Sequence, residues 1–230
     1  MSQYLSLFDL CALGYCLLIW FSYAHYSNFQ ESNYNLVKVM HRYRLQWIKN
    51  MIKRSDRTID IKVIGNLQFT TTYLIIVSVV AIGGIFVLMA YGSKAVILLN
   101  ELPFISTVNY HAWLIKSFVL LAIFIFGFFK LTWAVRQLNY AAILVLAAPY
   151  QSEGEDSIDD LKRQTKYVSK TATVLSNAGR HFNTGMRSFY FGMASLSWFV
   201  SPIFYILAAT LVVAVLYRRE YMSKTLILLS

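Results

Sequence analysis

The chain alternates between long apolar segments and polar, basic ones. Four segments, 4–26, 67–91, 112–135 and 189–216, are apolar over about 20 residues or more, the length that a helix needs to cross a bilayer. The last segment is longer than a span requires and contains Pro202, so we expect a kinked or tilted helix there. The pattern predicts an all-α polytopic membrane protein with four transmembrane helices.

The third apolar segment continues beyond the expected span. Residues 128–149 contain no helix breaker before Pro149. The pattern therefore predicts one helix of about 37 residues, roughly 55 Å at 1.5 Å per residue. Such a helix is longer than the bilayer is thick, and we expect it to extend into the cytoplasm.

The polar segments between the spans also have helical periodicity. Ser157 and Asp160 precede an apolar stripe over 158–182 and resemble a capping box. The acidic residues 153–160 are the one linker that we expect. A second stripe covers 36–63 with apolar residues at Leu36, Met40, Tyr43, Trp47, Met51, Ile52, Ile59 and Val63. We therefore predict one membrane domain, 1–230, extended by amphipathic cytoplasmic helices from 27–66 and 136–188.

The distribution of basic residues predicts the orientation. The net charge is +10, and segments 27–66 and 130–188 carry eight Lys and Arg residues each, whereas 92–117 carries two. By the positive-inside rule, both basic segments are cytoplasmic and the N-terminus lies outside an inner membrane. One feature conflicts with four spans, because the tail after 216 would lie outside although it is basic. If the fourth segment were a pair of half-helices, the tail would lie inside. The basic residues of the tail are Arg218, Arg219 and Lys224.

Composition narrows the functional class. The hydrophobic fraction of 57% and the aromatic fraction of 16% are typical of a membrane protein. Cys11 and Cys16 form no metal motif, and the four histidines form no i, i+3 or i+4 pair. The sequence has no nucleotide-binding loop and no hydrolase motif. We expect no cofactor, no metal, no nucleic-acid partner and no enzymatic activity.

A polar and basic stretch at 177–188 leads into the last apolar segment. Arg180, Asn183 and Arg187 have the spacing i, i+3, i+7 and share one helical face, with His181 beside it. Such a face at a membrane boundary can bind lipid phosphate, pair with carboxylates or line a vestibule.

A second group lies where the second span begins. Asp56 and Asp60 are one turn apart, so they can bind a cation or act as acid and base, although nearby arginines favour ion pairing. Asn66, Gln68 and Thr71 follow, and polar side chains at this depth bond to neighbouring helices or line a wet cavity.

Three further residues have chemistry that a membrane helix seldom carries. Arg136 and Asn139 lie beyond the third span, and we expect Asp56 or Asp60 to pair with Arg136. Asp9 is the one acid within a predicted span. Its position near the outer end favours an interfacial hydrogen bond over a proton relay.

The order of these motifs resembles a bacterial and plant family of four-span membrane proteins that is catalogued as a domain of unknown function. The resemblance covers nearly the whole chain after residue 40. It implies a membrane location and no particular activity, so no catalytic residue is transferred from it. The matching motifs are RSDRTIDIKVIGNLQ (54–68), ELPF (101–104), FFKLTWAVRQLNYAAILVLAAP (128–149), HFNTGMRSFYFGMASLSWFVSP (181–202) and VLYRREY (215–221).

Three functions agree with the sequence. The first is a homo-oligomeric channel for a small solute or ion, with anionic lipids bound at the basic segments. The second is a non-catalytic scaffold or accessory subunit of a membrane complex. The third is an enzyme for lipid head groups, with Arg180, His181 and Arg187 as phosphate contacts; it lacks a nucleophile or metal set.

Overall fold

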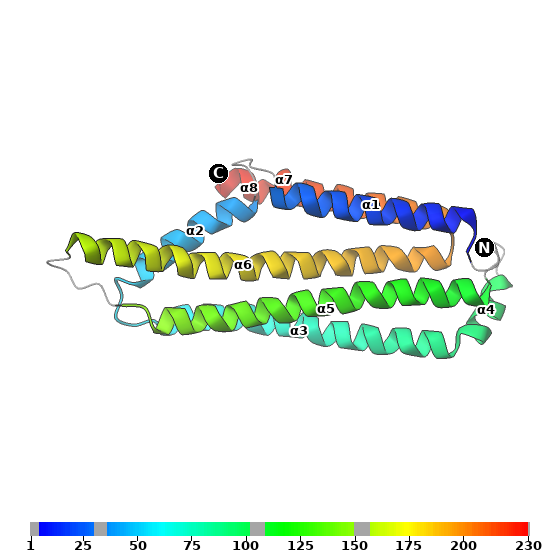
Figure 1. Cartoon of the computed structure of the whole chain (residues 1–230), viewed down its shortest axis with the longest axis horizontal. Coiled ribbons are helices and arrows are strands. Elements are labelled where there is room, and N and C mark those ends of the chain that lie inside the picture. Colours follow the sequence, from blue (N-terminus) through cyan, green and yellow to red (C-terminus); the bar gives the residue numbers. More distant parts are fainter. Residues whose placement is uncertain (1–4, 30–35, 102–108, 150–156, 230) are drawn as a thin grey trace. The chain divides into compact units, whose positions relative to one another are not determined.

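The structure, a computed structural model, describes residues 5–29, 36–101, 109–149 and 157–229. Within these ranges all regular structure is helical (Figure 1), which confirms the all-α prediction. The helices are α1 (Leu7–Phe29), α2 (Leu36–Met51), α3 (Thr58–Ala90), α4 (Gly92–Asn100), α5 (Tyr110–Leu146), α6 (Ile158–Leu196), the 3₁₀ turn η1 (Ser197–Phe199), α7 (Pro202–Tyr221) and α8 (Lys224–Leu229).

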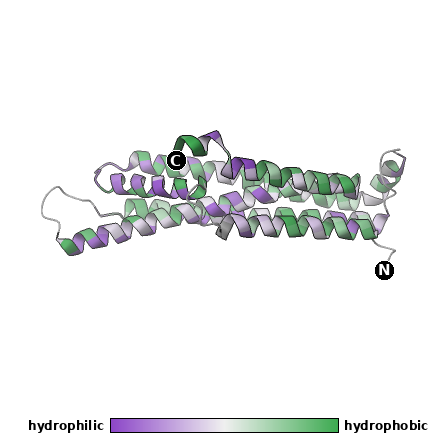
Figure 2. Cartoon of the chain, turned by 90° about the horizontal axis from the view of Figure 1, so that it is seen from above, coloured by the Kyte–Doolittle hydropathy of each residue, from purple (hydrophilic) through white to green (hydrophobic). Residues whose placement is uncertain are grey.

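Four helical stretches are long and apolar enough to cross a membrane. They are Leu7–Ser27, Thr58–Ala90, Tyr110–Leu146 and Pro202–Leu229. The predicted helix through the third span is confirmed, because α5 has 37 residues and ends three residues before Pro149. Figure 2 shows long hydrophobic runs along these helices.

The prediction of one kinked helix over 189–216 is wrong. α6 ends at Leu196, a 3₁₀ turn follows, and α7 starts at Pro202. Proline suits the first position of a helix because its missing N–H has no partner there in any case. Ser201 adds a cap, since its Oγ accepts from the Ile203 N–H at 3.3 Å.

The sequence pattern predicts one continuous helical stripe over 36–63, but the structure has two helices with a break between them. α2 ends at Met51, and α3 begins at Thr58, nine residues before the predicted span. The carboxylate of Asp56 accepts the Thr58 N–H at 2.8 Å and so caps the new helix. At the start of α6 the capping box is confirmed: the Ser157 hydroxyl donates to Asp160 at 2.7 Å and accepts its N–H at 3.2 Å. Residues 102–104 of the family motif and 153–156 of the acidic linker lie outside the described residues.

The chain packs into two compact units. Unit 1 contains Met1–Glu31, Ile76–Phe129 and Thr184–Arg219, and unit 2 contains Ser32–Ile75, Lys130–Asn183 and Glu220–Ser230. Three long helices, α3, α5 and α6, therefore contribute one part to each unit.

In unit 1, α6 runs antiparallel to α1 and α5. At its C-terminal end, Trp198 Nε1 donates to Asp9 near the start of α1 (2.8 Å), and the Trp198 carbonyl accepts from Lys116 near the start of α5 (3.0 Å). Farther back on α6, Arg187 Nη2 donates to Ser27 near the end of α1 (2.6 Å). The last part of α6 thus packs along α1 and α5 within unit 1.

The helix α7 runs parallel to α1. The hydroxyls of Tyr15 and Thr210 lie 2.9 Å apart, and farther along both helices the rings of Tyr26 and Tyr217 lie 6.4 Å apart. α6 and α7 therefore form a hairpin. Of the two sequence-based alternatives, a returning segment describes the chain better, and the basic end of α7 lies where α1 also ends.

Unit 2 has its own apolar core, formed by α2, the first part of α3, and parts of α5 and α6. Its fully or nearly fully buried residues include Ile48, Ile64, Leu138, Val145 and Leu175. Ala141, Ala172 and Ala178 also line the contacts and permit close approach of these helices. The predicted apolar stripes of α2 and α6 supply this core.

Candidate functional site

Four polar side chains of unit 2 converge between α2 and α6, and we name them the α2–α6 basic cluster: His41, Arg44, Ser176 and Arg180. His41 Nδ1 and Ser176 Oγ lie 2.8 Å apart, and Arg44 Nη1 donates to the same hydroxyl at 3.4 Å. Ser176 is buried, His41 and Arg44 are half-buried, and Arg180 is exposed. The cluster is therefore open to solvent on one side.

A glycine allows Arg44 to lie directly against α6. A Cβ atom at Gly179 would lie 2.9 Å from Arg44 Nη2, closer than real Cβ contacts. The guanidinium group occupies the space that any other side chain at position 179 would need.

The charges in and beside the cluster share one sign. Burial, followed by the charges of Arg44 and Arg180, lowers the pKa of His41. Burial, followed by Lys130 and Arg180, lowers the pKa of the neighbouring His181. Burial also lowers the pKa of Arg44, although its guanidinium remains charged at any physiological pH. Within the described ranges, no carboxylate forms an ion pair with Arg44.

The predicted face of Arg180, Asn183 and Arg187 is divided between the two units. Arg180 and the half-buried Asn183 belong to unit 2, whereas Arg187 belongs to unit 1. Arg187 is only 5% exposed and lies 5.1 Å from the ring centroid of Tyr23, besides its bond to Ser27. These contacts give Arg187 a packing role. His181 makes an edge contact with Trp133 at 6.3 Å.

The two predicted carboxylates have different surroundings. Asp60 is 2% exposed, and its Oδ1 accepts from Trp47 at 2.6 Å and from Arg54 at 2.8 Å. Its Oδ2 is buried, with no hydrogen-bond partner among the described residues. Asp56 is exposed, and hydrogen bonds from Thr58 lower its pKa. Asp60 is therefore an ion-pair partner and Asp56 is a helix cap. These separate roles disfavour the prediction that the two carboxylates act together as acid and base.

The remaining predicted residues lie on α3 and α5 in unit 2. Gln68 Nε2 donates to Asn139 Oδ1 at 2.6 Å and links the two helices. Asn66 is exposed, and Thr71 is buried and bonds to a carbonyl of its own helix at 2.7 Å. Among the described residues of this group, Gln68 and Asn139 are joined to each other by a hydrogen bond between helices.

The predicted pairing of Arg136 with an aspartate is wrong. Arg136 Nε donates to the Tyr140 hydroxyl at 2.9 Å, and the guanidinium lies 5.6 Å from the Trp133 ring centroid. The carboxylate of Asp60 already has the nearer Arg54 as its partner. Arg136 is exposed, so solvent and its own helix satisfy it.

Sequence reasoning missed a buried ion pair in unit 1. Asp9 (8% exposed) and Lys116 (5% exposed) approach to 2.9 Å. Ser6 and Trp198 also donate to the carboxylate, at 2.7 Å and 2.8 Å. The interfacial hydrogen bond predicted for Asp9 is part of a larger network. The signal in the sequence that could have indicated this pair is one acidic and one basic residue near the N-terminal ends of two apolar helices.

A second missed residue is Arg57, which caps α5. Its Nη1 donates to the carbonyls of Val145, Leu146 and Ala148 at 2.6–3.1 Å, and Nη2 donates to that of Pro149 at 3.2 Å. The last turn of α5 contains no basic residue of its own. Arg57, in the loop between α2 and α3, supplies the positive charge that a helix C-terminus favours.

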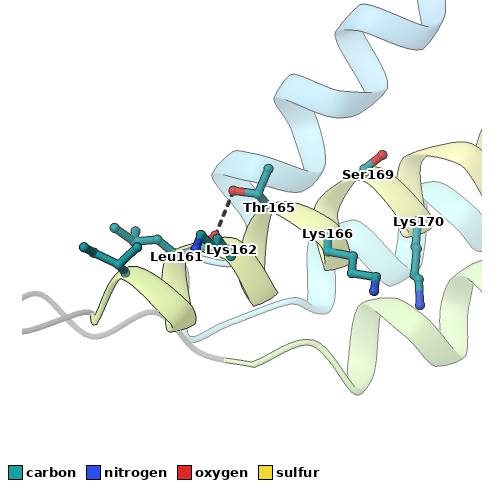
Figure 3. A pocket seen from close by; sticks show the side chains of 7 residues that line it. Leu161, Lys162, Thr165, Lys166, Ser169 and Lys170 are labelled. Carbon is teal, nitrogen blue, oxygen red and sulfur yellow. Dashed lines mark hydrogen bonds between the residues drawn. The ribbon is translucent and has the colours of Figure 1, made fainter.

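An open hollow lies along the first turns of α6 (Figure 3), on an exposed face where Lys166 and Lys170 project side by side. The Thr165 hydroxyl bonds to the Leu161 carbonyl at 2.8 Å, so it stays with its own helix. The lining residues are Ile158, Leu161, Lys162, Thr165, Lys166, Ser169 and Lys170. In the part of the chain that the structure describes, no three His, Cys, Asp or Glu side chains are placed to hold a metal ion.

Together these features define an all-α protein with four helices able to cross a membrane and a second helical unit that carries most of its basic side chains. The model of a family described as "Protein of unknown function, DUF599" matches residues 11–225, and the chain belongs to this family. The family resemblance of the motifs is confirmed. Neither a curated protein nor a solved structure matches the chain.

Proposed function

We propose that copies of this chain assemble in an inner membrane around a shared passage for a small solute or ion. The observation that carries the proposal is the exposed hydrogen bond between Gln68 and Asn139. Both residues lie on helices apolar enough to cross a membrane. At the membrane boundary, where the second span begins and the third has ended, an exposed amide pair suits a wet passage or another polar surface.

The interior of each unit favours a passage between copies over one through a single chain. In unit 1, Phe191 and Trp198 are buried among α1, α6 and α7. In unit 2, Ile64, Leu138 and Leu175 occupy the space between the helices. Close-packed side chains leave little room for a solute.

The hairpin supports the proposed orientation. Because α7 runs parallel to α1, an external N-terminus places the basic end of α7 on the cytoplasmic side, where α1 also ends. All of the basic segments, including the tail, then obey the positive-inside rule, and the conflict in the four-span interpretation disappears.

The experiment combines native mass with conductance. The full chain is extracted with its lipid shell, its mass is measured, and it is reconstituted in planar bilayers. We expect a closed ring whose conductance changes in Gln68→Leu and Asn139→Leu. The matched control is Thr210→Val, which alters an exposed polar residue on α7 in unit 1. A monomer without conductance refutes the proposal.

The second candidate function is a scaffold subunit, favoured by the hollow on α6. Lys162, Lys166 and Lys170 lie one turn apart beside the exposed Ile158 and Leu161. This combination suits an acidic amphipathic helix of a partner protein. A stoichiometric partner that is released by Lys166→Glu and Lys170→Glu, with no ring of identical subunits, supports this function.

A further inference from the structure

The α2–α6 basic cluster gathers positively charged groups from two helices of unit 2. His41 and Arg44 come from α2, and Arg180 comes from α6. Arg44 and Arg180 both act on His41, so the three groups lie within electrostatic reach of one another. No carboxylate of the described residues bonds to His41 or Arg44. Like charges gathered in this way repel, and an anion between them removes the repulsion.

Arg44 is held in place without a strong acceptor. Gly179 lets its guanidinium lie against α6, with Nη2 2.9 Å from the place that a Cβ would occupy. Its one acceptor in the described part of the chain is Ser176 Oγ, at the long distance of 3.4 Å. A guanidinium has five N–H donors in a fixed fork, so most of them remain available for an incoming ligand.

We propose that the α2–α6 basic cluster binds a phosphate group, which Arg44 contacts in a bidentate manner and which His41 and Ser176 contact at the buried side. The planar fork of an arginine matches two phosphate oxygens, and a hydroxyl or an imidazole N–H can donate to a third. Arg180 adds a second positive charge from the exposed side.

The position of the cluster favours the phosphate of an anionic lipid. α2 begins seven residues after α1 ends, and α1 is apolar enough to cross a membrane. α2 is amphipathic, with Val39, Ile48 and Met51 buried in unit 2 and charged residues on its other face. A basic amphipathic helix that follows a span is typical of the head-group layer. A free phosphate compound offers the same chemistry, and the experiment separates the two sources.

The experiment uses the full chain in nanodiscs of phosphatidylcholine with a minor fraction of phosphatidic acid. Native mass spectrometry counts the phosphatidic acid retained by each protein, and unfolding temperature is measured with and without inorganic phosphate in plain phosphatidylcholine. The variant Arg44→Gln removes the guanidinium group that contacts two phosphate oxygens in the proposal. The matched control, Lys49→Gln, removes one exposed positive charge from the same helix.

We expect phosphatidic acid retention to fall about tenfold or more in Arg44→Gln and to be unchanged in Lys49→Gln, because charge-assisted bonds contribute about 1.5–3 kcal/mol. An Arg44-dependent rise in unfolding temperature with inorganic phosphate, without lipid retention, supports the phosphate site and assigns it to a free ligand. Equal retention in both variants and no effect of phosphate overturn the proposal.

A second variant keeps the test decisive if Arg44→Gln does not fold. Arg180→Gln changes an exposed side chain, and we expect it to weaken retention several-fold while its unfolding temperature stays within a few degrees of the parent protein. Retention unchanged in a folded Arg180→Gln, together with loss in an unfolded Arg44→Gln, counts against the site. The result does not depend on the oligomeric passage, because lipid retention is measured without conductance.

Discussion

Replacing Lys116 by methionine tests whether the buried ion pair of unit 1 stabilises the fold. The substitution keeps the side-chain volume and leaves the carboxylate of Asp9 in a site that is 8% exposed. Removing one partner of a buried pair costs about 3–5 kcal/mol. Ser6 and Trp198 still donate to Asp9, so we expect the lower end, about 3 kcal/mol, which corresponds to a loss of roughly 6–12 °C in unfolding temperature.

The chain offers its own probe for this measurement. Cys16 is buried and Cys11 is exposed, so in a Cys11→Ser background a thiol-reactive dye reports when the helices separate. The control is Lys94→Met, which alters an exposed lysine on α4. In the double variant Asp9→Asn/Lys116→Met, no charge is left buried. We therefore expect its loss of stability to be about 1–3 kcal/mol smaller than the sum of the losses in the two single variants.

Two results would refute this reasoning. The first is a Lys116→Met protein as stable as Lys94→Met, which would mean that water or lipid head groups replace the amine at no cost. The second is strict additivity in the double variant, which would mean that the two charges do not interact in the folded protein.

The remaining predictions concern unit 2 and use the same unfolding assay. Gly179→Ala displaces the flexible end of the Arg44 side chain from α6, which offsets the gain of up to about 1 kcal/mol that we expect for Gly65→Ala, where the space around the glycine is open. Equal stabilisation by the two substitutions would contradict the close contact. Arg57→Gln removes the cap of α5 and costs about 1–3 kcal/mol, whereas the exposed control Arg163→Gln is neutral; two neutral variants would exclude the cap. The pKa of His41 is lower in the folded protein than in the unfolded chain, so the unfolded chain binds a proton more readily. The contribution of His41 to stability is therefore complete above about pH 6.5 and declines as the pH falls below that value. We expect His41→Gln to flatten this part of the plot of stability against pH. An unchanged slope would show that other groups cause it.

The sequence predicts those elements whose causes are local. The length of α5 follows from an uninterrupted helical pattern before Pro149, and the start of α6 follows from the spacing of Ser157 and Asp160. The turn after Leu196 is different, because Pro202 is compatible both with a kink inside one helix and with the first position of a new one.

The polar contacts of the site were harder to predict because they join distant residues. Asp9 meets Lys116 and Trp198, which lie 107 and 189 residues later in the chain. Periodicity identifies the helical face on which Arg44 lies, but it does not say that Gly179 of another helix leaves room for it. Arg57 caps a helix that ends about 90 residues later, and no local pattern indicates this.

The hairpin of α6 and α7 has a consequence for how the protein is made. The last part of α6 carries Arg187 and two serines, and α6 is not among the helices apolar enough to cross a membrane, yet Phe191 and the following Trp198 are enclosed by α1, α5 and α7. A polar segment of this kind enters a bilayer poorly when it leaves the ribosome alone. In a membrane its insertion would therefore wait for α7, which is synthesised after it, and would occur against helices that are already in place. This part of the fold is then completed only after α7 has been translated.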